Sequence, residues 1–152
     1  MKQKFIFIQL PLIDHSLGYI QGNVDYAPAL LAGLFDTYYK SKADVLQLPS
    51  VITNFCSDQI LLRYIMNQNP TVICFTCYLW NIERSIELSK KLKQLLPQSL
   101  ILFGGPEIAI HSMVFNTFHN YITAFIIGEG EWFFDKYFNN TLDVYKHSIH
   151  NN

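Results

Sequence analysis

The chain has 152 residues, of which half are hydrophobic, and its 11 basic and 12 acidic side chains leave a net charge of −1. This length suits a single domain with one core, and the balance of charge excludes the basic surface that nucleic acid or an anionic membrane requires. Aromatic residues make up 15% of the chain, which favours a large core, a groove for a flat ligand, or a face covered by another domain.

The cysteines do not form a recognisable disulfide or metal framework. There are three, Cys56, Cys74 and Cys77, whereas a small secreted protein usually carries an even, regularly spaced set. Cys74 and Cys77 form a lone C-x-x-C, but no second ligand pair completes a zinc site. Because Cys74 falls within an expected buried strand, we interpret it as a packing residue.

The first expected element is a strand over residues 5–10, where a nearly continuous apolar run is typical of a strand covered on both faces. Lysines precede this run as in a signal peptide, but Gln9 and Pro11 interrupt it. No apolar run approaches the length of a membrane span, so we expect a cytoplasmic protein. Residues 11–25 have no periodicity, and such long loops often carry function.

Two helices and one strand are expected next. A helix begins near Asp25, a suitable N-cap, and a short strand follows over residues 43–48. A second helix covers residues 57–68 and ends before Pro70. Helical spacing predicts that the first helix buries Leu30, Leu31, Leu34, Phe35 and Tyr38, and that the second buries Ile60, Leu61, Tyr64 and Ile65.

Residues 71–107 form a strand–helix–strand unit around which the rest of the chain is organised. Strands over 72–76 and 100–103 flank a helix over 82–96, whose acidic side chains come early and basic ones late, as the helix dipole favours. The second strand ends in Gly104 and Gly105. The backbone can approach a bulky ligand there, because no β-carbon intervenes.

The last third repeats the pattern. A weaker helical stretch runs to about residue 119, a strand covers 123–127, and a final helix follows the sequence G-E-G-E at 128–131. From residue 139 the chain is polar and patternless, so we expect a domain over 1–138 and a polar tail or linker over 139–152.

Five strands alternating with five helices predict an α/β fold, a flavodoxin-like (Rossmann-like) three-layer sandwich with a parallel sheet in the order 2-1-3-4-5. In such sheets ligands bind beyond the C-terminal ends of the strands, at the switch point between strands one and three. The long loop after the first strand and the polar or glycine-rich loops after strands three, four and five all fall at that edge. The sequence therefore predicts a binding site there.

Several familiar ligands do not fit these loops. FMN binding requires a Ser/Thr/Gly-rich phosphate loop after strand one, where this chain has Q-L-P-L-I at residues 9–13. A phospho-receiver needs an aspartate after strand three and a lysine after strand five, where this chain has Thr76 and Gly128. The G-x-G-x-x-G fingerprint and the P-loop are absent.

Three motifs carry a resemblance to a known family: F-T-C-Y-L-W-N at 75–81, F-G-G-P-E at 103–107 and G-E-G-E at 128–131. In this order they resemble the N-terminal cobalamin-binding domain of B12-dependent radical SAM enzymes, over roughly residues 4–138. Many members are methyltransferases, and others are cyclases or ring-contracting enzymes. The resemblance implies cobalamin as cofactor, with its nucleotide tail between sheet and helices and its corrin ring over the strand ends.

The resemblance also implies particular residues. Thr76 matches a small hydroxyl residue that ends strand three, and Gly104 and Gly105 match a glycine pair that lets the backbone approach the tail. The full set of cofactor-binding residues that we expect is Thr76, Cys77, Tyr78, Leu79, Trp80, Gly104, Gly105, Pro106, Gly128, Glu129 and Gly130. No catalytic or metal-ligating residue is assigned.

Two features are missing. One is the D-x-H-x-x-G motif of methionine synthase-like cobalamin domains, which many radical SAM relatives also lack, so its absence does not exclude cobalamin binding. In the D-x-H-x-x-G motif the histidine binds cobalt; here His15 keeps the H-x-x-G spacing, but Asp14 stands one place too late and is poorly placed to fix the imidazole tautomer. A solvent-facing loop histidine is the favoured interpretation of His15. Radical SAM chemistry also needs C-x-x-x-C-x-x-C, which three cysteines at these positions cannot supply. We expect no iron–sulfur cluster in this chain, and any radical SAM domain must act in cis or in trans.

Each motif also has a purely structural interpretation. Gly104 and Gly105 can form a tight turn, Glu131 can stabilise a helix N-terminus, Thr76 can bond a nearby backbone group, and Trp80 can be core. The leading hypothesis is a cobalamin-binding module that is not an enzyme by itself. The alternative is an interaction or remnant domain that keeps the fold without a cofactor, and a small-nucleotide enzyme is a third interpretation.

Overall fold

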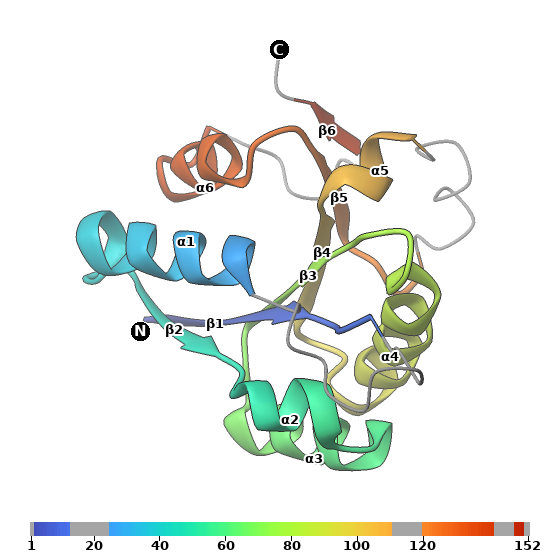
Figure 1. The fold of residues 1–152 in the computed structure, drawn as a ribbon. Helices are drawn as coiled ribbons and strands as arrows, with labels where there is room; N and C mark the ends of the chain where they lie inside the picture. Colours follow the sequence, from blue (N-terminus) through green and yellow to red (C-terminus); the bar gives the residue numbers. More distant parts are fainter. Residues whose placement is uncertain (1, 13–24, 111–119, 142–147, 151–152) are drawn as a thin grey trace.

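A parallel sheet forms the middle layer of the protein (Figure 1). The computed structural model describes residues 2–12, 25–110, 120–141 and 148–150. Within these residues the sheet has six strands, in the spatial order β2 (Ala43–Gln47), β1 (Gln3–Gln9), β3 (Val72–Thr76), β4 (Leu100–Gly104), β5 (Ala124–Ile127) and β6 (Ser148–His150). The predicted α/β class and the order 2-1-3-4-5 of the five expected strands are confirmed.

The sixth strand was not expected from the sequence. Ser148–His150 lies in the segment for which the sequence predicts a polar tail, yet it pairs in parallel with β5, with Ser148 opposite Phe125. Backbone hydrogen bonds to an open sheet edge require no apolar pattern in the added strand. A short edge strand of this kind therefore leaves little signal in the sequence.

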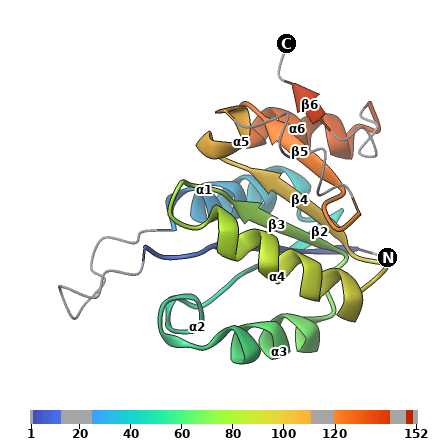
Figure 2. The ribbon, with the colours of Figure 1, turned by 90° about the vertical axis from the view of Figure 1, so that its right-hand side faces the viewer.

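Helices cover both faces of the sheet (Figures 1 and 2). On one face lie α1 (Tyr26–Leu34), which continues as a π-helical turn over Phe35–Tyr39, and α6 (Gly130–Phe138). The other face is covered by α2 (Ser50–Phe55), α3 (Asp58–Gln68), α4 (Ile82–Leu95) and α5 (Pro106–Ile110). The short helix α2 was not predicted, and residues 111–119 of the expected helix after 107 lie outside the described residues. In the described part of the chain no helix is long and apolar enough to cross a membrane.

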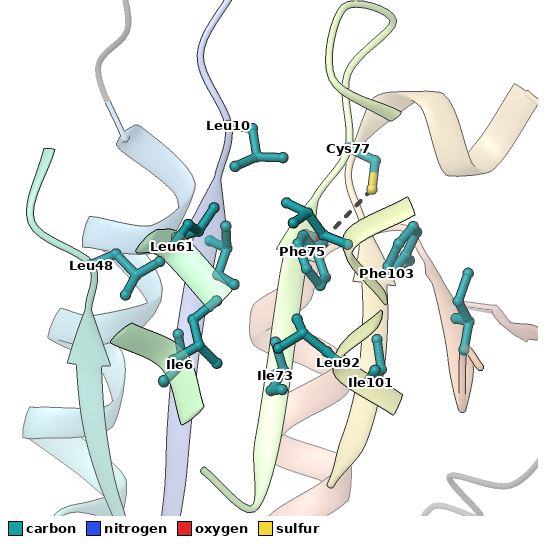
Figure 3. Close-up of a cluster of buried hydrophobic side chains, with 14 of the residues drawn as sticks. Ile6, Leu10, Leu48, Leu61, Ile73, Phe75, Cys77, Leu92, Ile101 and Phe103 are labelled. Atoms are coloured by element: carbon teal, nitrogen blue, oxygen red, sulfur yellow. Dashed lines mark hydrogen bonds between the residues drawn. The ribbon is translucent and has the colours of Figure 1, made fainter. Parts of the chain in front are cut away.

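Alternation along β1 divides the core into two layers. Phe5 and Phe7 point toward α1 and α6, whereas Ile6 and Ile8 point toward α3 and α4. Figure 3 shows the second layer, in which residues of four strands meet those of α3 and α4. Since both faces are buried, the strand had to be apolar at nearly every position, which is the pattern its sequence shows.

Phenylalanines dominate the layer under α1 and α6. The rings of Phe5 and Phe35 meet edge to face with their centroids 4.9 Å apart, as do those of Phe35 and Phe134. Phe7 meets Phe134 in the same geometry at 5.6 Å. Edge-to-face pairs add about 0.5–1.5 kcal/mol each beyond the burial of their surface. This cluster fixes α1 and α6 on the sheet and closes the space between them from below.

The predicted buried faces of two helices need correction. Leu30 and Tyr38 are 46% and 70% exposed, and Tyr39 is buried in place of Tyr38. For the tyrosines the cause is the π-helical turn, whose wider repeat delays the inward-facing position by one residue relative to regular helical spacing. Leu30 precedes this turn, in the regular part of α1. In α3, Ile60 is also half exposed, while Leu61 and Ile65 are fully buried as predicted.

Candidate functional site

A cleft of about 390 Å³ opens at the C-terminal ends of β3, β4 and β5, between the sheet and helices α1 and α6. This volume lies at the lower end of the range for small-molecule sites, roughly 300–1,000 Å³. The cleft lies at the C-terminal edge of the sheet, as the sequence predicts for a ligand, but it is centred on the ends of β3, β4 and β5 rather than on the switch point between β1 and β3. Of the predicted binding residues, it is lined by Thr76, Tyr78, Gly104, Gly105, Pro106, Gly128, Glu129 and Gly130.

Strand register sets the depth of the cleft. Thr76 lies opposite Gly104 near the mouth, and two residues earlier Cys74 lies opposite Leu102 at the floor. Side chains two apart on a strand share a face, so Thr76 and Cys74 both face α1 and α6. The cleft therefore extends two side-chain rows down from the edge of the sheet.

Gly104 leaves space that none of the described residues fills. A β-carbon at this position would lie 3.7 Å from Ile126 Cβ, an ordinary van der Waals contact, and Gly104 is not among the residues with positive φ. Neither backbone conformation nor packing therefore requires a glycine here. The missing side chain widens the cleft directly beside Thr76.

Gly105 has a different role, because its conformation requires glycine. Its φ is 109°, and a β-carbon there would lie 2.6 Å from the carbonyl oxygen of Cys77. This close approach accompanies a hydrogen bond in which the Cys77 N–H donates to the Gly104 carbonyl at 2.7 Å. Gly128 also has positive φ, 105°. These two glycines shape the strand-end turns that form the mouth of the cleft.

Asn81 holds the strand ends together. It is 1% exposed, and its amide nitrogen donates to the carbonyls of Leu10 (3.0 Å) and Thr76 (3.1 Å). Its Oδ1 accepts a hydrogen bond from the Tyr78 N–H at 2.8 Å. Asn81 thereby ties the ends of β1 and β3 to the turn that enters α4. In the sequence Asn81 is the last residue of the F-T-C-Y-L-W-N motif and stands just before a helix, where asparagine is a common cap, but it was not among the predicted binding residues.

Replacing Asn81 with alanine should destabilise the domain by about 2 kcal/mol, because three backbone groups at the strand ends lose their partner. Urea unfolding followed by circular dichroism measures this change. Asn67→Ala on the exposed surface of α3 is the matched control and should stay within about 0.5 kcal/mol of the wild type. Equal stability of the two variants would show that Asn81 does not organise this edge.

Three predicted residues lie outside the cleft. Cys77 is fully buried on the α4 side, with its thiol 3.9 Å from the Phe75 carbonyl oxygen (Figure 3). Leu79 and Trp80 are 76% and 47% exposed. The Trp80 ring stacks on Tyr78, with centroids 4.5 Å apart and planes 4° from parallel. Tyr78 lines the cleft and Trp80 does not, so Trp80 lies beside the mouth of the cleft, against Tyr78.

One wall of the cleft comes from α1, which the sequence did not place in the site. Tyr26, Ala27, Leu30 and Leu31 line it. A β-carbon on Gly130 would lie 3.3 Å from Leu31 Cδ2, so this glycine allows α1 and α6 to approach closely. Leu30 and Leu31 had been predicted as core residues. Apolar spacing cannot distinguish a leucine that packs in the core from one that lines a cleft.

The cleft is apolar at its floor and acidic at its mouth. Glu129 and Glu131 line the mouth, and none of the described lining residues is lysine, arginine or histidine. Burial raises the pKa of the Cys74 thiol, so this floor residue stays neutral. The described lining therefore fits a neutral, mainly apolar group, and none of these residues provides a cationic side chain for a phosphate.

Metal ligands do not assemble in the described residues: no group of three or more His, Cys, Asp or Glu side chains could hold an ion there. Cys56, Cys74 and Cys77 are free thiols. His15, the weak candidate for a cobalt ligand, lies outside the described residues.

Comparison with known proteins finds partial similarity. No family model matches the chain. The cobalamin-dependent radical SAM methyltransferase TokK of Streptomyces tokunonensis is 34% identical over 62 residues, which are 41% of this chain and 9% of TokK. The 2-(S-pantetheinyl)-carbapenam-3-carboxylate methyltransferase of Streptantibioticus cattleyicolor is 32% identical over 63 residues, again 41% of this chain and 9% of the relative. The matched part of the chain thus spans about 9% of the length of these relatives.

The fold also has a counterpart among solved structures. The N-terminal domain of a hypothetical protein from Thermotoga maritima superposes with a TM-score of 0.53 at 17% identity, covering 80% of this chain and 88% of that domain. At this identity the likeness concerns the fold alone. It supports the Rossmann-like arrangement of parallel strands and covering helices.

Proposed function

We propose that this chain is a cobalamin-binding module, in which the cleft at the ends of β3, β4 and β5 holds the nucleotide tail of the corrinoid. The observation that carries the proposal is Gly104, whose absent side chain leaves space beside Thr76 although neither packing nor φ requires a glycine. The partial similarity to a cobalamin-dependent radical SAM methyltransferase supports the same assignment.

The lining residues fit the tail of a corrinoid. The lower base is flat and mainly apolar, which suits a floor of Cys74 and Leu102. The Thr76 hydroxyl can donate a hydrogen bond to a ring nitrogen of that base. The tail's phosphate remains near solvent, since no cationic side chain among the described lining residues would bind it. The corrin ring then lies over the strand ends, beside Tyr78 and Trp80.

The chain's own contribution is binding and orientation. A bound corrinoid supplies a cobalt centre that can carry a methyl group. Asn81 and Gly105 hold the strand-end turns in place, and the floor and Thr76 fix the tail. We propose that the module presents the corrinoid to a radical SAM domain, either in the same polypeptide or in another.

Gel filtration after incubation with hydroxocobalamin tests this function. We expect close to one equivalent of red corrinoid to elute with the protein. Cobinamide, which lacks the nucleotide tail, should be retained far less, because it cannot occupy the cleft. A colourless protein peak would refute the proposal, and equal retention of the two corrinoids would place the tail elsewhere.

An interaction domain without cofactor is the second candidate, and the exposed apolar side chains favour it. Leu79 and Phe55 are 76% and 66% exposed, and large exposed apolar residues often mark interaction surfaces. The same gel filtration separates the two functions. Self-association of a protein that takes up no cobalamin would support the interaction domain.

A further inference from the structure

The floor of the cleft is almost free of polar side-chain atoms. Phe7, Leu102 and Phe134 line it with at most 2% of their surface exposed, and Ile126 lies one row above them, beside Gly104, with 5% exposed. Cys74 completes the floor with a thiol, which is only a weak hydrogen-bond donor. The stronger polar side chains among the described lining residues lie nearer the mouth: Thr76, Tyr26, Tyr78, Glu129 and Glu131.

The backbone groups of the floor already have hydrogen-bond partners in the sheet. Cys74 pairs with Phe7 on one side and with Leu102 on the other, and Leu102 also pairs with Ala124. Strands flanked on both sides use their N–H and C=O groups in the ladder. A ligand that reaches the floor therefore meets hydrocarbon, a neutral thiol and backbone groups that already have partners.

We propose that this floor selects corrinoids by their lower base and favours a benzimidazole over an adenine. The inference rests on the proposed function, because it concerns the same cleft. A benzimidazole has one ring nitrogen available to Thr76, and the rest of its edge is hydrocarbon. Adenine carries an amino group and additional ring nitrogens. Against Leu102, Ile126 and Phe134 these atoms lose their water without gaining partners.

Equilibrium titration of the purified chain with three corrinoids tests the selection: cobalamin, its analogue with an adenine lower base, and cobinamide. A buried polar group left unpaired weakens binding roughly ten-fold or more. We therefore expect cobalamin to bind at least about ten-fold more tightly than the adenine analogue.

A matched pair of variants at Ile126, one row above the floor and beside Gly104, tests whether the apolar lining is responsible. Ile126→Thr adds a hydroxyl at a cleft-lining position, whereas Ile126→Val removes the same bulk without adding one. We expect the threonine variant to narrow the difference between the two nucleotide-bearing corrinoids several-fold and the valine variant to preserve it. Thermal unfolding of both variants confirms that the comparison is between folded proteins.

The outcomes separate this inference from the function on which it rests. If cobalamin and the adenine analogue bind with equal affinity, and both bind more tightly than cobinamide, the proposed preference for a benzimidazole is refuted. The proposed cobalamin site then still stands. Tighter binding of the adenine analogue also refutes this preference. If no corrinoid binds, the proposed function fails and the selection fails with it.

Discussion

A leucine at position 104 should abolish cobalamin binding while the domain stays folded. The β-carbon itself fits, at 3.7 Å from Ile126 Cβ, but the rest of the side chain would enter the cleft beside Thr76. We expect the dissociation constant for hydroxocobalamin to rise about 100-fold or more, equivalent to roughly 2.8 kcal/mol. The free energy of unfolding should change by no more than about 1 kcal/mol, because the site is open and a glycine in a strand is replaced by a better strand former. Spectroscopic titration and urea unfolding measure the two quantities.

Gly104→Ala is the graded control for this variant. Its single methyl group makes only an ordinary contact with Ile126 and should weaken binding much less than leucine does. If Gly104→Leu bound cobalamin like the wild type, the tail could not lie next to this strand end.

Replacing the neighbouring Gly105 with alanine should instead lower the free energy of unfolding of the domain substantially. The position has a φ of 109°, and the added β-carbon would lie 2.6 Å from the Cys77 carbonyl oxygen and 2.8 Å from its nitrogen. The conformational strain costs about 1–2 kcal/mol. Relief of the clash would also disturb the hydrogen bond from Cys77 N–H to the Gly104 carbonyl. We expect a total loss of about 3 kcal/mol or more.

Urea unfolding tests this expectation by comparing the free energies of unfolding of Gly105→Ala and Gly104→Ala, which make the same chemical change at adjacent positions. Stabilities within about 0.5 kcal/mol of each other would contradict the assigned geometry of the turn. Because Gly105→Ala acts on folding, a loss of cobalamin binding in that variant says nothing about the site. Position 104 is the informative one of the pair.

The sheet could be predicted because each central strand carries a strong local signal. β3 and β4 are apolar runs ended by turn residues, and their bounds agree with the prediction to within one residue. Along the chain, these strands alternate with helices long enough to connect parallel strands. Because such connections are right-handed, few topologies of a parallel sheet remain. The confirmed order of the five expected strands follows from these two constraints.

The missed elements have weak local signals. β6 depends on an open edge of β5, and α2 is a single short helix after Pro49. The π-helical turn after Leu34 changes which tyrosine is buried without any change in composition. Each of these features is determined by tertiary packing, which a sequence pattern read one segment at a time does not contain.

The residues of the predicted site also fall into two groups: those that are recognisable in the sequence and those that only tertiary packing reveals. Gly104, the last residue of β4, and Gly128, directly after β5, attract notice in the sequence because each glycine stands where an apolar strand ends, and both line the cleft. Cys74, Leu102 and Phe134 form its floor, but their spacing is that of ordinary core residues. The sequence can therefore predict the edge at which a ligand binds, whereas the depth and polarity of the cleft require the packing of α1 and α6 on the sheet.

Amide chemical shifts of the isotopically labelled chain, recorded during titration with cobalamin, test the central claim most directly, since they report binding and location together. We expect saturable shifts concentrated at Thr76, Gly104, Gly105 and Gly128, with α3 residues such as Asn67 unaffected. A spectrum that does not change with cobalamin, or shifts confined to the edge strand β2, would contradict a corrinoid site at the ends of β3, β4 and β5.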